Sequence, residues 1–232
     1  MVHQMENVIF NGDCCKILQT IVQHSVDLII ADPPYNISKP DNHIWGLGGR
    51  QGLYFGDWDQ GFNQIDWIKY AANTLKENAN IVIFNCWSNL GIIQQECKKQ
   101  HICIKRCLVL SKRNPAPFNK ERMFVNDVEF ALWGVYNSKD KPTAWTFNRK
   151  EPLEKCVIST TVQSSKLHPT MKDIKVIEKL ITLLSNKGDL VLDPFLGSGT
   201  TGVAAKKLER SFIGIEIDTK YFNIAKERIC KS

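Results

Sequence analysis

The amino-acid sequence predicts an α/β fold in which helices cover both faces of a mainly parallel sheet. Short apolar runs rich in Val, Ile and Phe alternate with stretches of helical periodicity along most of the 232 residues. Several of these runs are nearly continuous, as in strands that are buried on both faces. With 43% hydrophobic and 23% charged residues, the composition excludes a disordered or fibrous chain. The length suits one domain with inserted loops.

Seven strands and six helices are predicted. The strands lie at residues 8–10, 26–31, 80–86, 102–110, 128–135, 190–193 and 212–217. The helices lie near residues 13–23, 64–77, 88–99, 171–185, 200–208 and 219–229. Asp218 or Thr219 is the expected N-cap of the last helix. Because no helix separates the fourth and fifth strands, we expect them to form an antiparallel hairpin at the edge of the sheet.

Two regions lack this alternation. Residues 36–62 contain six glycines, and a loop of this length within a compact domain is typical of a functional segment. We expect a mobile active-site loop there, whose Trp45, Tyr54 and Trp58 either close over a ligand or form a small satellite core. Residues 136–166 are polar and weakly periodic. The chain contains no internal repeat, so residues 1–232 are predicted to form a single domain.

The positive charge is concentrated in one part of the sequence. The whole chain has 30 Lys and Arg against 24 Asp and Glu, a formal charge of +6. Residues 98–155 hold 13 basic and 6 acidic residues, a net +7, so the rest of the chain carries −1. A basic region on an otherwise balanced protein is typical of a protein that binds a polyanion, and the alternative is a solvated charged face.

Several classes of protein are disfavoured by what the sequence contains. The eight cysteines form no C-x-x-C pair, and no histidines cluster at ligand spacing, so we expect buried thiols and no metal site. No apolar stretch approaches the ~18–20 residues of a membrane span. The first residues lack the pattern of a secretory signal. We therefore expect a cytoplasmic protein that does not contact a membrane.

A glycine-rich turn lies between a predicted strand and a predicted helix late in the chain. Gly197, Gly199 and Gly202 match the pattern G-x-G-x-x-G, and Glu216 follows at the end of the next strand. A carboxylate at that place binds ribose hydroxyls in nucleotide-binding βαβ units. No Lys follows the glycines, which argues against a P-loop. The turn suits either a dinucleotide or S-adenosylmethionine.

A second motif, Asp32-Pro33-Pro34-Tyr35, follows the strand predicted at 26–31. Its two prolines fix the backbone beyond the carboxyl end of the strand, where ligands bind in open α/β sheets. They also remove two N–H donors, which leaves a carboxylate and a carbonyl as neighbouring acceptors for the two hydrogens of an exocyclic amine. Tyr35 offers a flat face on which a base can stack. This motif favours methyl transfer to an amino group over dinucleotide chemistry.

The order of the two motifs resembles that of a known family. Asp32–Tyr35 early and Asp193–Thr201 late are similar to the amino-methylating DNA methyltransferases with the catalytic motif first, the beta group, most of which belong to bacterial restriction–modification systems. Residues 11–13 resemble the segment whose acid contacts the cofactor adenine. Residues 168–172 resemble the His-Pro-Thr-x-Lys segment before the cofactor methionine site, but Asp173 stands where a Pro usually follows.

The resemblance implies a circularly permuted, Rossmann-like fold of the S-adenosylmethionine-dependent methyltransferases. It also implies methyl transfer from that cofactor to N6 of an adenine flipped out of double-stranded DNA. Tyr35 would stack on the base, while the Asp32 carboxylate and the Pro33 carbonyl accept the N6 hydrogens. Residues 136–166 would be a short target-recognition region. His168 is expected either to contact a ligand or to make a structural hydrogen bond.

The residues expected at the site fall into three groups. The catalytic residues are Asp32, Pro33, Pro34 and Tyr35. The cofactor-binding residues are Asp13, Cys14, Lys172, Asp193, Phe195, Gly197, Gly199, Thr200, Thr201 and Glu216. The DNA contacts are Lys112, Arg113, Asn114, Arg122 and Arg149.

Other functions remain open at this point. Cytosine also has an exocyclic amine, but N4-cytosine enzymes more often carry Ser at the position of Asp32, and enzymes acting on RNA or a protein amide more often carry Asn. A nicotinamide oxidoreductase explains the glycine turn and leaves Asp32–Tyr35 unexplained. A non-catalytic DNA-binding protein explains only the charge. The expected partners are double-stranded DNA, a second copy of the chain sharing DNA contacts, and a restriction endonuclease acting separately.

Overall fold

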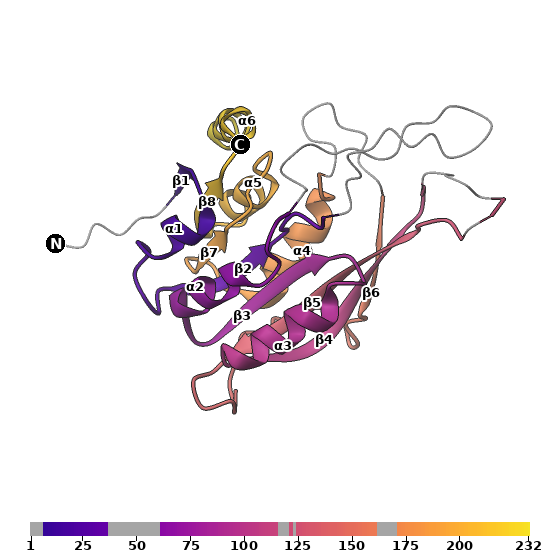
Figure 1. Ribbon diagram of the computed structural model, residues 1–232, viewed down its shortest axis with the longest axis horizontal. Coiled ribbons are helices and arrows are strands. Elements are labelled where there is room, and N and C mark those ends of the chain that lie inside the picture. The colour runs from indigo at the N-terminus through magenta and orange to yellow at the C-terminus, as the bar shows by residue number, and fades with distance from the viewer. Residues whose placement is uncertain (1–6, 37–60, 116–120, 123, 162–170) are drawn as a thin grey trace.

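The computed structural model describes residues 7–36, 61–115, 121–122, 124–161 and 171–232 (Figure 1). Within these residues, eight strands form one sheet in the order β1-β8-β7-β2-β3-β5-β4-β6. The strands are β1 (Val8–Asn11), β2 (Val26–Ala31), β3 (Leu75–Asn85), β4 (Ile102–Lys112), β5 (Val128–Tyr136), β6 (Val157–Thr160), β7 (Leu190–Asp193) and β8 (Ser211–Glu216). The helices are α1 (Cys14–Leu18), α2 (Asp66–Thr74), α3 (Leu90–Lys99), α4 (Ile174–Leu184), α5 (Thr200–Lys207) and α6 (Thr219–Cys230).

The α/β fold with a mainly parallel sheet is confirmed, and the count of seven strands is wrong. The unexpected strand is β6, which pairs in parallel with β4 and takes the edge of the sheet. Of its four residues only Thr160 is buried, so its sequence carries no clear hydrophobic pattern. Backbone pairing rather than side-chain burial holds this strand. The antiparallel hairpin of β4 and β5 exists but does not lie at the edge, because β5 pairs with β3 and β6 flanks β4.

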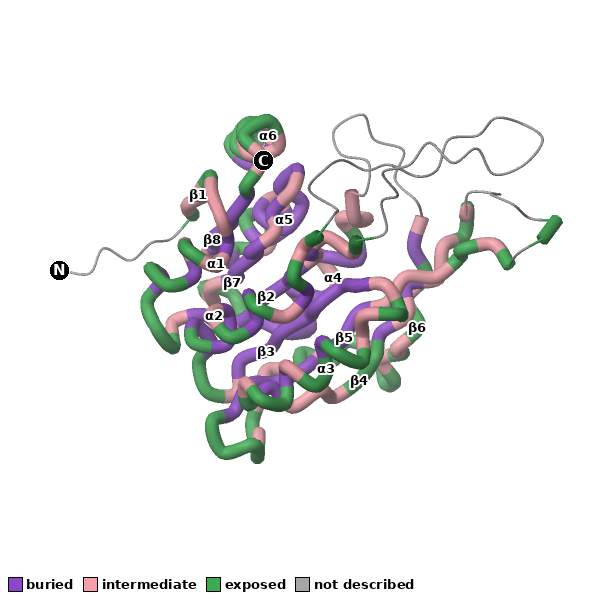
Figure 2. Tube along the Cα trace, viewed as in Figure 1, coloured by how far each residue is buried: buried purple, intermediate pink, exposed green. Residues whose placement is uncertain are grey.

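The strands bury both faces, and each face is covered by its own set of helices (Figure 2). Alternate residues of β2 show this: Leu28 and Ile30 pack with α4, α5 and α6, while Ile29 and Ala31 pack with α1, α2 and α3. The period of two in a strand therefore explains why its sequence is continuously apolar. Among the described residues, no helix is both long and apolar enough to cross a membrane.

Acidic caps define the start of three helices. Asp13, Asp173 and Asp218 are the N-caps of α1, α4 and α6, and each accepts a hydrogen bond from a backbone N–H of the first turn. The first helix is shorter than the stretch predicted at 13–23. The cap gives Asp173 a structural role: it begins α4 directly after Lys172.

The sheet order brings the two motifs together. β2 and β7 are parallel neighbours, so Asp32–Tyr35 and the glycine turn both follow carboxyl ends at one edge of the sheet. β1 lies beside β8, with Asn11 opposite Glu216, so the first strand extends the sheet where the last strand ends. This is the arrangement expected of the circularly permuted fold. We call the edge that bears Asp32 the carboxyl edge, and the opposite one the amino edge.

Candidate active site

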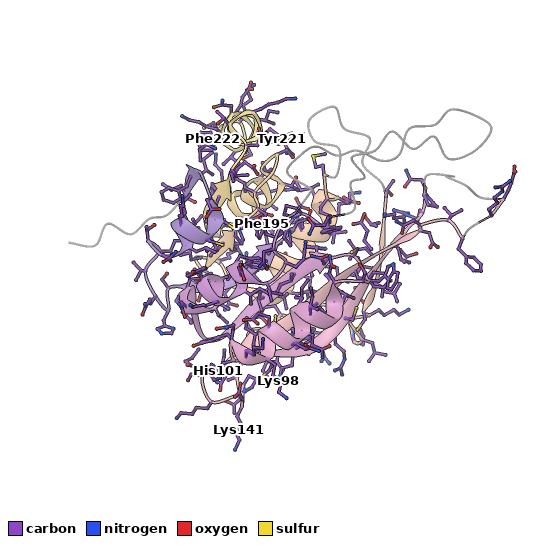
Figure 3. All side chains as sticks on the ribbon, in the orientation of Figure 1. Lys98, His101, Lys141, Phe195, Tyr221 and Phe222 are labelled. Atoms are coloured by element: carbon purple, nitrogen blue, oxygen red, sulfur yellow. The ribbon has the colours of Figure 1, made fainter. Side chains whose placement is uncertain are left out.

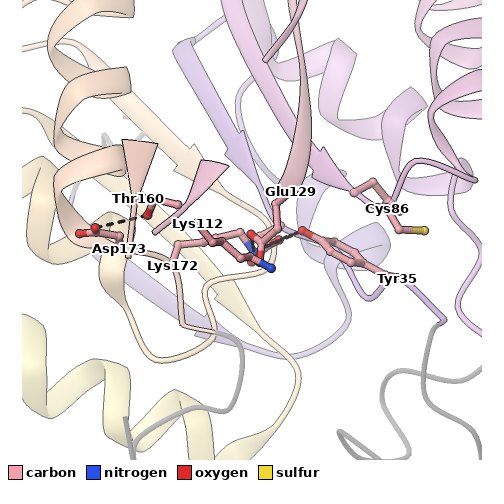
Figure 4. A network of polar contacts seen from close by, with 9 residues as sticks. Tyr35, Cys86, Lys112, Glu129, Thr160, Lys172 and Asp173 are labelled. Atoms are coloured by element: carbon pink, nitrogen blue, oxygen red, sulfur yellow. Dashed lines mark hydrogen bonds and ion pairs between the residues drawn. The ribbon is translucent and has the colours of Figure 1, made fainter. Parts of the chain in front are cut away.

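Asp32 is the centre of a polar network at the carboxyl edge. Figure 4 labels Tyr35, Lys172 and Glu129 of this network. The Tyr35 hydroxyl donates a hydrogen bond of 2.6 Å to Asp32 Oδ1. The Lys172 ammonium donates to both carboxylate oxygens, at 2.8 Å to Oδ1 and 2.7 Å to Oδ2. Lys172 Nζ also lies 3.2 Å from the Tyr35 hydroxyl. Two side chains from distant parts of the sequence therefore hold one carboxylate.

Glu129, near the start of β5, extends the network away from Asp32. One of its oxygens lies 3.6 Å from Lys172 Nζ, and the other lies 2.9 Å from Lys112 Nζ at the end of β4. The charges therefore alternate in sign along Lys112, Glu129, Lys172 and Asp32, and they cancel. The Lys172 side chain is 11% exposed and that of Asp32 24% exposed, so the network becomes more open toward Asp32.

The surroundings fix the charge of each group. Burial alone would lower the pKa of Lys172, but the Asp32 and Glu129 carboxylates raise it above its ordinary value. Burial alone would raise the pKa of Glu129, but Lys172 and Lys112 lower it. Burial, with the charges of Asp32 and Glu129, raises the pKa of Tyr35 well above its ordinary value. Lys172 and Glu129 are thus ionised, and Tyr35 remains a hydrogen-bond donor.

Side-chain amides hold the backbone of the catalytic motif. Gln64 Nε2 donates to the Pro34 carbonyl at 2.7 Å, and Asn89 Nδ2 donates to the Tyr35 carbonyl at 3.2 Å. Asn85, the last residue of β3, joins the two amides: it donates to Gln64 Oε1 and accepts from Asn89 Nδ2, both at 2.8 Å. Gln64 and Asn85 are buried, which makes these bonds costly to break.

The glycine turn and Glu216 form the second half of the site. Gly197 and Gly199 have φ of +54° and +87°, a conformation that favours glycine. The Gly197 N–H donates to Glu216 Oε2 at 2.7 Å, and the Asp218 N–H donates to Oε1 at 2.8 Å. Burial raises the pKa of Glu216. The turn thus places its backbone beside a carboxylate that backbone N–H groups hold at both oxygens.

Asp193 and Phe195 connect the turn to the core. The Phe195 N–H donates to Asp193 Oδ1 at 2.9 Å, and burial raises the pKa of Asp193 to about 7. The Phe195 ring, labelled in Figure 3, makes edge contacts with Trp67 and Phe62, with centroids 5.1 Å and 5.5 Å away. Phe195 is thereby fixed between α2 and the turn.

Comparison with known proteins identifies the family. A family model for N6 and N4 methyltransferases, described as DNA methylase, matches residues 26–227. The chain belongs to this DNA methylase family. The type II methyltransferase M2.LlaDCHI of Lactococcus lactis subsp. cremoris is 33% identical over 249 residues, which cover 99% of this chain and 91% of the relative. The restriction–modification methyltransferases are therefore its relatives.

Solved structures of other DNA methyltransferases have the same fold. The crystal structure of the M1.HpyAVI complex with S-adenosylmethionine superimposes with a TM-score of 0.76 at 33% identity, over 96% of this chain and 98% of that chain. Its ligand is the cofactor that the sequence predicts for this methylase. The cytosine-N4-specific PvuII DNA methyltransferase gives a TM-score of 0.73 at 19% identity, over 95% of this chain and 85% of that chain. That likeness concerns the fold alone.

The described residues of the methylase assemble most of the predicted site. Asp13, the N-cap of α1, lies at the same edge as Glu216, because the Gly12 N–H donates to the Glu216 carbonyl at 2.9 Å. Cys14 is buried in the core beside it, and burial raises its pKa. Thr200 and Thr201 begin α5 directly after the turn and are buried. Trp45, Tyr54, Trp58 and His168 lie outside the described residues.

Lys172 is the predicted cofactor residue whose position differs most from the expectation. The resemblance placed it before the cofactor methionine site, whereas in the structure its ammonium group contacts Asp32 in the catalytic motif. Asp173, the next residue, is the N-cap of α4.

The five predicted DNA contacts do not share one surface. Lys112, Arg113 and Asn114 lie at the carboxyl edge, but Lys112 is ion-paired with Glu129. Arg122 is exposed in the connection between β4 and β5. Arg149 follows Asn148, whose side chain donates to the Ser185 carbonyl at 2.8 Å, just past the last turn of α4 at the amino edge.

The basic segment 98–155 is therefore divided between the two edges of the sheet. Figure 3 shows Lys98, His101 and Lys141 at the end of the molecule away from Phe195. The cause is the hairpin: β4 carries the chain from the amino edge to the carboxyl edge, and β5 returns it. Only some of the basic residues in this segment lie beside the site, because those near Lys98 and Lys141 lie at the amino edge.

Sequence reasoning missed four polar residues of the site, namely Gln64, Asn85, Asn89 and Glu129. Asn85 ends β3, and Glu129 begins the antiparallel β5 at the same edge. Polar side chains at the ends of apolar strands were therefore the available signal. To use it for Glu129, the pairing of β5 between β3 and β4 had to be known first.

Proposed function

We propose that this DNA methylase transfers the methyl group of S-adenosylmethionine to N6 of adenine in a specific double-stranded DNA sequence, within a restriction–modification system of the beta group. The observation that carries the proposal is the Asp32 carboxylate, held by Lys172 and Tyr35 at the carboxyl end of β2, beside the glycine turn at the end of β7. A carboxylate at this position is more typical of the adenine enzymes than of the cytosine enzymes.

The second half of the site fits the cofactor. The Glu216 carboxylate, held in place by the Gly197 and Asp218 N–H groups, would accept from the ribose hydroxyls, and Gly197 would let the cofactor approach the turn. Asp13 lies at the same edge as Glu216 and would contact the adenine region of the cofactor. When bound, S-adenosylmethionine supplies an electrophilic methyl group on a positively charged sulfur.

The other half of the site is suited to a flipped base. Extrusion of the target adenine costs a few kcal/mol, which stacking on Tyr35 helps to offset. The Asp32 carboxylate and the Pro33 carbonyl then accept the two hydrogens of N6, which draws its lone pair out of conjugation and directs it toward the methyl group. No covalent bond between enzyme and base is required.

The Asp32 carboxylate would also stabilise the positive charge that develops on N6 during the reaction. As the N6–carbon bond forms and the sulfur–carbon bond breaks, N6 becomes positive until it loses one proton. A carboxylate hydrogen-bonded to that nitrogen stabilises the positive charge and lies where the proton leaves. A fixed group of this kind contributes on the order of 3 kcal/mol to transition-state stabilisation.

Product analysis tests the proposal. The protein is incubated with unmethylated plasmid DNA and S-adenosylmethionine labelled in its methyl group, and the DNA is digested to nucleosides. We expect label in N6-methyl-2′-deoxyadenosine, and sequencing of the product then gives the recognised site. Label in N4-methyl-2′-deoxycytidine contradicts the adenine assignment, and unlabelled DNA contradicts the function. The homodimer and the separate endonuclease stay predictions.

A further inference from the structure

We propose that Lys172 is a positioning residue for the methyl-transfer reaction, fixing Asp32 so that one acceptor position on Oδ2 faces the target amine. The inference rests on the proposed function and adds to it a residue that contacts neither the base nor the cofactor. It also assigns a role to Glu129, which contacts Lys172, and to Lys112, which contacts Glu129.

The hydrogen bonds to Asp32 show which acceptor position remains. Each carboxylate oxygen accepts about two hydrogen bonds. Oδ1 receives one from the Tyr35 hydroxyl and one from Lys172, so it is filled. Within the described part of the chain, Oδ2 receives one from Lys172. The position left on Oδ2 is the one that an N–H of the target amine can take.

Lys172 is held from several sides. Its ammonium group lies 5.3 Å from the centroid of the Phe84 ring and 5.4 Å from that of Tyr35, both within cation–π range. Its backbone directly precedes the α4 cap, where Asp173 accepts from the Lys175 N–H at 3.0 Å.

The α4 cap is in turn tied to the edge strand. The Thr160 hydroxyl of β6 donates to Asp173 at 3.3 Å, a contact visible in Figure 4. The side chain and the backbone of Lys172 are therefore both fixed before any substrate binds.

Glu129 adjusts how strongly Lys172 acts on Asp32. An ammonium group that paired with Asp32 alone would neutralise the charge that the reaction needs. Glu129, 3.6 Å from Lys172 Nζ, shares that positive charge, and Lys112 balances Glu129 in turn. The alternation keeps Asp32 oriented and still negative toward the amine.

A second lysine–aspartate pair, at the other end of β2, provides a matched control. Lys76 Nζ donates to both oxygens of Asp27, each at 2.8 Å, which reproduces the geometry of the pair formed by Lys172 and Asp32. This pair lies at the amino end of β2, away from the site, and Lys76 is 47% exposed. Lys76→Met therefore removes the same kind of ion pair without touching the proposed machinery.

The test compares Lys172→Met with Lys76→Met in the full chain. We expect kcat on plasmid DNA to fall about 100-fold or more in Lys172→Met and to stay within twofold of the parent in Lys76→Met. The Kd for S-adenosylmethionine, measured by calorimetry, should change less than twofold, and so should KM for DNA. Lys172→Arg should recover at least tenfold of the lost kcat, because its planar fork also makes two bonds to a carboxylate. If Lys172→Met does not fold, Lys172→Gln takes its place.

A double-mutant cycle tests the part played by Glu129. Glu129→Gln alone should lower kcat about tenfold, and Glu129→Gln with Lys172→Met should be no slower than Lys172→Met alone, because both changes act on Asp32. Fully additive losses contradict the coupling.

The outcomes separate the two proposals. A parent protein that leaves DNA unmethylated overturns the proposed function. A parent that methylates DNA, with a Lys172→Met variant as active as Lys76→Met, overturns only the inference. A weaker Kd for S-adenosylmethionine in Lys172→Met overturns it in favour of the cofactor role expected from the sequence. A raised KM for DNA with a reduced salt dependence overturns it in favour of a phosphate contact.

Discussion

The two ends of β2 carry similar chemistry with different consequences. Asp27 at the amino end and Asp32 at the carboxyl end are each held by a lysine that donates to both carboxylate oxygens. Each also accepts a third hydrogen bond: Asp27 from the Leu190 N–H at 2.9 Å, and Asp32 from a tyrosine hydroxyl. The ion pairs alone do not show which end is the site.

The difference lies in the surroundings. Lys76 is 47% exposed, so its pair with Asp27 is a surface ion pair of the kind that contributes about 0–1 kcal/mol. Lys172 is 11% exposed and lies between two carboxylates, an arrangement that costs desolvation. At the amino end the third donor is backbone and joins β2 to β7, whereas at the carboxyl end every donor is a side chain. A lysine buried between two carboxylates at the carboxyl end of a strand is an arrangement typical of a functional site.

The largest expected effect comes from deleting the carboxylate at the functional end. Asp32→Ala should lower kcat about 1000-fold or more, because it removes the acceptor for the amine, while the Kd for S-adenosylmethionine stays within about threefold. Radiolabel transfer to plasmid DNA and calorimetry measure the two quantities. Loss of cofactor binding in this variant would show that Asp32 has been placed on the wrong side of the site.

Asp27→Ala is the matching change at the amino end. It should leave kcat per folded molecule unchanged and lower the free energy of unfolding by about 1–3 kcal/mol, because the Leu190 N–H loses its acceptor. Urea unfolding measures this. If Asp27→Ala were stable but inactive, the proposed contrast between a structural Asp27 and a catalytic Asp32 would be wrong.

The second prediction concerns the acids that flank β7. Burial raises the pKa of Asp193 to about 7 from an ordinary value of 3.8, so the folded protein holds a proton there that the unfolded chain releases. Stability should therefore fall as pH rises from 5 to 8, by about 2–3 kcal/mol from this one group. Asp193→Asn should abolish that part of the slope in urea unfolding at the two pH values.

Asp189, at the amino end of the same strand, is the control. Burial also raises its pKa, but the side chain is far less buried, so Asp189→Asn should change the slope less than Asp193→Asn does. Equal changes in the two variants would mean that burial at the carboxyl edge is not what shifts Asp193.

The sequence predicted the parts of the site that lie within continuous motifs. Asp32–Tyr35 and Gly197–Glu216 were found because strand, turn and helix follow each other in the chain, which is sufficient to place them at one edge. Glu129 was missed because only the position of β5 between β3 and β4 brings it to Asp32.

Two further differences from the sequence-based expectations have the same origin as the omissions. The basic segment 98–155 is continuous in sequence, but the hairpin divides it between two edges, so Arg149 lies apart from Arg113. β6 was missed because its stability comes from pairing with β4 and its side chains are mostly exposed. The order of strands in the sheet decides which residues share an edge and which strands pair, and the local hydrophobic periodicity of a sequence does not reveal that order.

The smallest expected effect compares two glycines with nearly the same backbone conformation. Gly199 has a φ of +87° and Gly188 a φ of +82°, so an alanine is strained by about 1–2 kcal/mol at either position. A Cβ at Gly199 would lie 3.0 Å from the Ala225 backbone of α6, whereas a Cβ at Gly188 meets nothing within 4 Å. Gly199→Ala should therefore lower the free energy of unfolding by about 1–2 kcal/mol more than Gly188→Ala in urea titrations. It should also weaken S-adenosylmethionine binding about tenfold, because α6 and the turn must shift apart, and Gly188→Ala should leave that affinity unchanged. Equal affinities in the two variants would show that the contact between the turn and α6 does not set the geometry of the cofactor site.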